Sequence, residues 1–97
     1  MKLPHECQSI EEIRKEIDDI DHNILRLIGK RVSYIEAIIK YKNNADDVKA
    51  KERHSEVIRE RRSFAESLDL DPDVIENMYQ IMMDYSIKIQ LRLLNNK

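Results

Sequence analysis

The chain has 97 residues, of which 41% are hydrophobic and 37% are charged, and its formal net charge is −2. This length predicts one domain, residues 1–97, and the hydrophobic content argues against a wholly disordered chain. The charge gives no reason to expect nucleic acid or an anionic membrane as a partner. No apolar run approaches the ~20 residues that span a bilayer. The first residues contain no signal-peptide core, so we expect a cytoplasmic protein.

The side chains that commonly bind metals or form disulfides are few and scattered. The single cysteine, Cys7, cannot form an internal disulfide. His5, His22 and His54 have neither close ligand spacing nor a cysteine partner, so we expect no metal site. No glycine-rich phosphate loop and no Ser/His/Asp order is present.

A long first helix is predicted from about Ser9 to Lys42. Ser9 and Glu12 form an S-x-x-E capping box at its start. Steps of three and four residues separate the members of one apolar stripe, namely Ile10, Ile13, Ile17, Ile20, Ile24, Leu27, Ile28, Val32, Ile35, Ile38 and Ile39. At ~1.5 Å per residue this helix is roughly 50 Å long, longer than a compact globule of this size. A second copy of the same helix could cover its stripe.

The rest of the chain predicts a polar loop and two further helices. The loop is Asn43–Val48, and the second helix runs from about Lys49 to Ser67. Asp71 and Pro72 are an N-cap and a first helical residue, which begin a third helix that ends near Leu94. The expected core residues of these two helices are Val57, Phe64, Ala65 and Leu68, then Ile75, Met78, Met82, Tyr85, Ile89 and Leu93. We therefore predict an all-α fold of three helices (long, short, long) that forms an intertwined homodimeric bundle.

Basic residues occur where the first helix is expected to be apolar. On a helical wheel Arg31 and Lys42 fall inside the stripe, and Arg14 lies at its edge. Charged side chains are seldom buried unless they are paired. Two explanations stay open at this point. The cations form internal ion pairs, for example with Asp21, or reach water at the helix ends; or they line a pocket for a small anion with more than one carboxylate.

The spacing of these cations bears on the second explanation. Arg14 and Arg31 are about 25 Å apart along one helix, whereas Arg31 and Lys42 are about 16 Å apart. The two arginines therefore cannot hold one small molecule within a single subunit. Antiparallel pairing of two first helices could bring Arg14 of one chain beside Arg31 of the other. Further polar candidates are Arg53 and His54 on the second helix and Tyr79, Ser86 and Gln90 on the third.

Many positions of this chain match a known family. The sequence resembles the all-helical chorismate mutases and, more closely, the bacterial isochorismate pyruvate lyases. The joint spacing of Arg14, Arg31, Lys42 and Gln90 is the most specific part of the match. Other matching positions are Ile13, Ile17-Asp18, Ile20-Asp21, Tyr34, Ala37, Glu52-Arg53, Glu60-Arg61, Ala65-Glu66, Leu70-Asp71, Val74 and Glu76.

The resemblance implies roles for these residues. Arg14 from the partner subunit and Arg31 would bind substrate carboxylates, with Arg53 as a further cation at the pocket wall. Lys42 would stabilise negative charge on the ether oxygen of the breaking C–O bond, and Gln90 would donate a hydrogen bond to the same region. No cofactor or metal would be required.

The resemblance leaves the substrate open between isochorismate and chorismate. Many mutases carry a glutamate, which contacts the ring hydroxyl of chorismate, where this chain has His54. Ser86, in contrast, occupies a position where mutases often have serine. We favour a lyase that converts isochorismate to salicylate and pyruvate, with weak mutase side activity. The alternatives are a chorismate mutase and a non-catalytic helical dimerisation or regulatory module.

Overall fold

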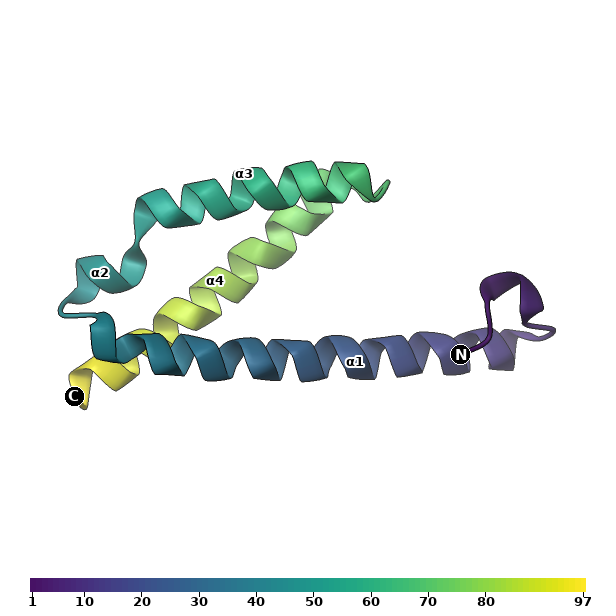
Figure 1. Cartoon of the computed structure of the whole chain (residues 1–97), viewed down its shortest axis with the longest axis horizontal. Helices are drawn as coiled ribbons and strands as arrows, with labels where there is room; N and C mark the ends of the chain where they lie inside the picture. The colour runs from purple at the N-terminus through teal and green to yellow at the C-terminus, as the bar shows by residue number, and fades with distance from the viewer. The chain divides into compact units, whose positions relative to one another are not determined.

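The computed structural model describes all residues, 1–97, and contains helices but no strand. The elements in chain order are η1 (Pro4–Glu6), α1 (Ile10–Ala37), η2 (Ile38–Tyr41), α2 (Ala45–Lys49), α3 (Lys51–Ser67) and α4 (Pro72–Asn95) (Figure 1). The predicted all-α class is confirmed. The chain falls into two compact units, Met1–Ser33 and Tyr34–Lys97, and each is described by itself below.

The first unit begins with the short turn η1, which is tied to the start of α1. The backbone N–H of Glu12 donates to Oγ of Ser9 at 3.1 Å, as the capping box predicts. The Glu12 carboxylate accepts from the backbone N–H of Gln8 at 2.7 Å and from Nζ of Lys2 at 2.9 Å. These two bonds lower the pKa of Glu12, and the bond from Gln8 is the larger cause.

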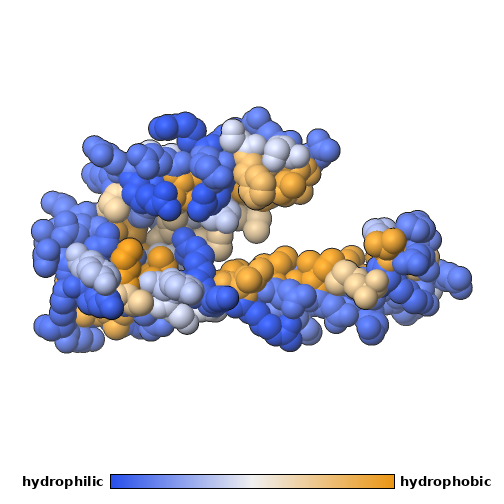
Figure 2. All heavy atoms as spheres, viewed as in Figure 1, coloured by the Kyte–Doolittle hydropathy of each residue, from blue (hydrophilic) through white to orange (hydrophobic).

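The apolar stripe of α1 is exposed from Ile10 to Leu27 and partly exposed at Ile28, Val32 and Ile35. No residue of α1 is buried, and the side chains of Ile13, Ile17, Ile20 and Ile24 remain 44–48% exposed. Figure 2 shows part of this stripe as a row of hydrophobic residues along the helix. An exposed apolar stripe of this length is unusual for a protein that acts as a monomer.

The second unit begins near the end of α1, where the structure corrects the sequence-based prediction. The α-helix ends at Ala37 and tightens into η2, so Lys42 is not helical but extended, with φ −105° and ψ 134°. The wheel position assigned to Lys42 is therefore wrong. The apolar period continues through Ile38 and Ile39, and the sequence has no breaker there, so periodicity alone could not reveal the change to a 3₁₀ turn.

The expected polar loop Asn43–Val48 is also wrong in part, because it contains α2. Oδ1 of Asn44 accepts from the backbone N–H of Asp47 at 2.9 Å and caps this short helix. Val48 is only 1% exposed, and α2 packs against α4. Ala50, with φ 40°, separates α2 from α3, so the second long helix begins at Lys51 rather than Lys49.

α3 and α4 pack together as a helical hairpin. The predicted end of α3 at Ser67 is confirmed, and Oδ1 of Asp71 caps α4 as expected by accepting from the N–H of Asp73. Arg62 bridges the two helices through Asp73 at 2.9 Å and Glu76 at 2.8 Å. None of the helices combines the length with the apolar character needed to cross a membrane.

The core of the chain is small. Its hydrophobic members are Val48, Val57, Ala65, Met83 and Ile89. Four residues expected in the core remain at least half exposed in the single chain, namely Phe64, Leu68, Met78 and Tyr85. The sequence pattern therefore marks more apolar surface than one chain buries.

Candidate active site

Lys42 is half-buried where η2 ends, and its side chain reaches the following turn. Its Nζ donates to the backbone oxygen of Asp47 at 2.8 Å. The Asp47 carboxylate in turn accepts from the backbone N–H of Asn43 at 2.9 Å. Asp47 is not among the residues predicted from the sequence. The signal that could have found it is the N-cap pattern Asn44-x-x-Asp47, which brings Asp47 back toward the residues before the helix.

Gln90 and Ser86 lie one turn apart on α4, and both are buried, at 5% and 4% exposure. Oγ of Ser86 donates to the backbone oxygen of Met82 at 2.9 Å. Oε1 of Gln90 has no hydrogen-bond partner although it is buried. Buried polar atoms are nearly always paired, and an amide can present its oxygen or its nitrogen by a flip. Gln90 therefore keeps hydrogen-bonding capacity that the chain itself does not use.

Arg53 and His54 are neighbours on α3, but they border two different surface hollows. Arg53 is exposed and borders a hollow of about 610 Å³ with Asp46 and Lys49. His54 is half-buried and borders a hollow of about 280 Å³ between α3 and α4, with Glu76 and Met83.

Arg14 and Arg31 lie 17 positions apart on α1, both in the unit Met1–Ser33. Arg14 is exposed and Arg31 is half-buried. Neither Arg14 nor Lys42 forms an ion pair within the chain, and neither does Asp21. Internal ion pairing therefore does not explain why Arg14 and Lys42 occur where they do.

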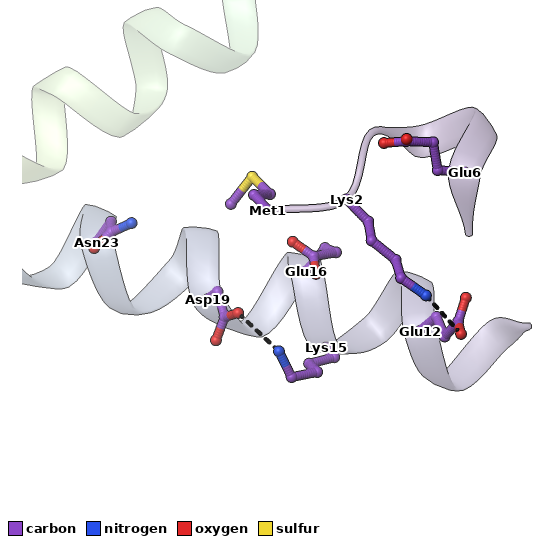
Figure 3. A pocket seen from close by; sticks show the side chains of 8 residues that line it. All are labelled: Met1, Lys2, Glu6, Glu12, Lys15, Glu16, Asp19 and Asn23. Carbon is purple, nitrogen blue, oxygen red and sulfur yellow. Dashed lines mark hydrogen bonds and ion pairs between the residues drawn. The ribbon is translucent and has the colours of Figure 1, made fainter. Parts of the chain in front are cut away.

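The hollow drawn in Figure 3 lies near the N-terminus of the chain, and none of the predicted site residues line it. Its volume is about 840 Å³, and η1 and the first turns of α1 line it. Its charged lining consists of Lys2, Lys15, Glu6, Glu12, Glu16 and Asp19. Four carboxylates against two ammonium groups disfavour an anionic ligand. The structure also contains no group of three or more His, Cys, Asp or Glu placed to hold a metal ion.

Comparison with known proteins identifies the class to which this fold and these residues belong. The family model described as chorismate mutase type II matches residues 13–91, and the chain belongs to that family. The chain is similar to the isochorismate pyruvate lyase of Pseudomonas aeruginosa, with 30% identity over 92 residues, which cover 95% of this chain and 91% of the relative. It is also similar to the chorismate mutase of Methanocaldococcus jannaschii, with 27% identity over 84 residues, which cover 86% and 85% of the two chains. The family expected from the sequence is confirmed.

Proposed function

We propose that this protein is an isochorismate pyruvate lyase that converts isochorismate to salicylate and pyruvate. The observation that carries the proposal is the likeness to the Pseudomonas lyase, which extends over 95% of the chain. In this reaction the ether C–O bond breaks, and one ring hydrogen passes to the methylene carbon of the enolpyruvyl group. That group leaves as pyruvate while the ring becomes aromatic. The atoms balance without a co-reactant, so we propose no cofactor and no metal.

The proposed site uses positive charge and one buried amide. Lys42 stabilises the negative charge that grows on the ether oxygen, and Gln90 hydrogen-bonds in the same region. Arg31 binds a substrate carboxylate, and Arg53 lies at the pocket wall as a further cation. His54 and Ser86 are possible pocket residues. The unpaired amide oxygen of Gln90 supports this assignment, because a buried polar atom without a partner suits a site that is completed by a ligand.

The proposed protein is a homodimer in which Arg14 reaches the site of the partner subunit. Two observations support the dimer. Four isoleucines of the α1 stripe, Ile13, Ile17, Ile20 and Ile24, are 44–48% exposed in the single chain, and Arg14 is about 25 Å from Arg31 along one helix. The family match spans parts of both compact units, which supports one domain over residues 1–97. A cytoplasmic location and a place in salicylate or siderophore synthesis belong to the same proposal.

The direct test incubates the pure protein with isochorismate and follows salicylate by its fluorescence. We expect salicylate and pyruvate in equal amounts. Lys42→Ala should lower kcat by about 10² to 10³, the size of effect seen when one preorganised donor is lost. Lys40→Ala is the matched control. The ammonium of Lys40 lies over the ring of Tyr41, at 5.2 Å from its centroid, and does not contact α2 as the ammonium of Lys42 does. Absence of salicylate, with rapid formation of prephenate from chorismate, would overturn the lyase assignment.

The second candidate function is chorismate mutase. It is favoured by the likeness to the Methanocaldococcus mutase and by Ser86, at a position where mutases often have serine. This candidate predicts that the gene restores growth of a mutase-deficient strain without phenylalanine and tyrosine. The third alternative, a non-catalytic dimerisation module, is disfavoured, because the matching family and both relatives are enzymes.

A further inference from the structure

Lys97 lies two residues beyond the end of α4, and its side chain spans back to the segment that carries Lys42. Its Nζ donates to the backbone oxygens of Ile39, Lys40 and Lys42, at 3.2, 3.4 and 2.8 Å. These oxygens lie at the end of η2 and at its C-cap residue, where no helix continues, and the Ile39 oxygen also accepts the backbone N–H of Lys42 at 3.0 Å. A cation at the carboxyl end of a helix also interacts favourably with its dipole. Lys97 therefore acts as a cap supplied from a distant part of the chain.

The contact with Lys42 is the shortest of the three and fixes its backbone. The side chain of Lys42 is held at the opposite end, by the backbone oxygen of Asp47 in α2, at 2.8 Å. Val48, buried at 1% exposure, anchors α2 against α4. The segment between η2 and α3 is thus held at two places, by the apolar packing of Val48 against α4 and by the charged contact of Lys97, which follows α4.

We propose that Lys97 is a positioning residue for Lys42, which fixes where the Lys42 ammonium is presented to the substrate. This inference rests on the proposed function, because it gives Lys42 the catalytic role described there. An ammonium that stabilises developing charge is effective only if it is held in place before the reaction. A small displacement of such a group costs a large part of its effect. Lys97 touches no reacting atom, so it acts only through Lys42.

The test compares Lys97→Met, which removes the donors and the charge, with Lys97→Arg, which keeps both. Lys88→Met is the matched control, since Lys88 is an exposed lysine of α4. We expect Lys97→Met to lower kcat about tenfold with little change in KM. This pattern is typical when the lost interaction stabilises mainly the transition state. Lys97→Arg should restore most of the activity, and Lys88→Met should leave it unchanged.

A double variant separates positioning from a general structural effect. In the Lys42→Ala background, Lys97→Met should cause no further fall in kcat, because the group that it positions is already absent. A tenfold fall in that background as well, or unchanged kcat in the single variant, would overturn the positioning role.

A second measurement does not depend on activity. Peptide-level hydrogen exchange over residues 42–48 should become faster in Lys97→Met and stay at the wild-type rate in Lys88→Met. If the wild-type protein converts neither ether, the proposed function fails and the positioning role fails with it. In that case accelerated exchange would still show that Lys97 fastens the segment. Unchanged exchange would overturn the contact itself.

Discussion

At the scale of single residues, Gln90 is where stability and function are opposed. It is 5% exposed, and its amide oxygen has no partner. An unpaired buried polar atom costs stability, whereas an apolar group of similar shape at the same place does not. Such a residue fits a site in which the ligand supplies the missing partner. In such a site the free protein is slightly less stable because of the unpaired oxygen, and substrate binding would remove this cost.

Gln90→Leu should therefore lower kcat by about 10² while the free energy of unfolding stays equal or rises. Steady-state kinetics and urea denaturation at one fixed protein concentration measure the two effects. Asn77→Leu, the same kind of change at an exposed amide of α4, is the control and should alter neither quantity. Retained activity together with a clear loss of stability would mean that Gln90 serves the core and not the site.

The individual site residues differed in how far the sequence could predict them. The resemblance to the family singled out Lys42 and Gln90 as candidates, whereas the unpaired amide oxygen of Gln90 is visible only in the structure. The contact between Lys97 and Lys42 joins residues 55 positions apart. No local pattern reports such a pair, because the contact depends on where α4 ends relative to η2.

At the scale of elements, the helix ends with strong capping chemistry were predicted correctly. The Asp71-Pro72 pair marked the start of α4, and the end of α3 at Ser67 agrees with the prediction. α2 was missed because its five residues hold one large apolar side chain, Val48, among polar ones. A helix that is stabilised by one buried residue and one cap leaves almost no periodic signal.

Val48 should carry most of the stability of α2. Val48→Ala removes two buried carbon atoms, each of which contributes ~0.8 kcal/mol, and it leaves a cavity. We therefore expect the free energy of unfolding to fall by about 2 kcal/mol. Urea denaturation at a fixed protein concentration measures this change. Asp46→Asn, at an exposed position of the same helix, should change stability by less than about 0.5 kcal/mol. A loss at Val48 no larger than that of the control would show that α2 is not anchored as described.

The η1 turn should detach from α1 in acid. The folded pKa of Glu12 is lowered from 4.5, chiefly by the Gln8 N–H and then by Lys2. Because the folded pKa is lowered, the Glu12 carboxylate stabilises the folded arrangement at pH values above the ordinary pKa of 4.5. This contribution is lost as the pH falls through the folded pKa. The amide proton shift of Gln8 should therefore titrate with a midpoint below 4.5.

Lys2→Met provides the control for this titration. Because Lys2 also lowers the pKa of Glu12, through its hydrogen bond and its charge, the midpoint should move upward in this variant. A wild-type midpoint at or above 4.5 would contradict the contact between Gln8 and Glu12.

At the scale of the whole molecule, the chain exposes more apolar surface than its small core can explain. Phe64, Val74 and Ile81 are 51–70% exposed, in addition to the stripe of α1. The sequence predicted a dimer from the length of that stripe. The structure of one chain adds that the isoleucines from Ile13 to Ile24 are each 44–48% exposed.

Ile20→Lys should separate the subunits, because it puts a charge at the centre of the stripe. Analytical ultracentrifugation should find a dimer for the wild type and a monomer for this variant, with loss of activity. His22→Lys adds the same side chain on the opposite side of α1 and should leave the dimer intact. A wild-type protein that sediments as a monomer at micromolar concentration would refute the paired arrangement.

The most direct test of a site shared by two subunits mixes two inactive proteins. Arg14→Ala and Lys42→Ala are each expected to be nearly inactive on isochorismate. In a hybrid dimer, one site receives the intact Lys42 of one chain and the intact Arg14 of the other. After equal mixing and verified subunit exchange, about one quarter of wild-type salicylate production should return, since half of the dimers are hybrids with one intact site of two. If activity stays at the mean of the two separate variants, each site is built from one chain and the shared site is contradicted.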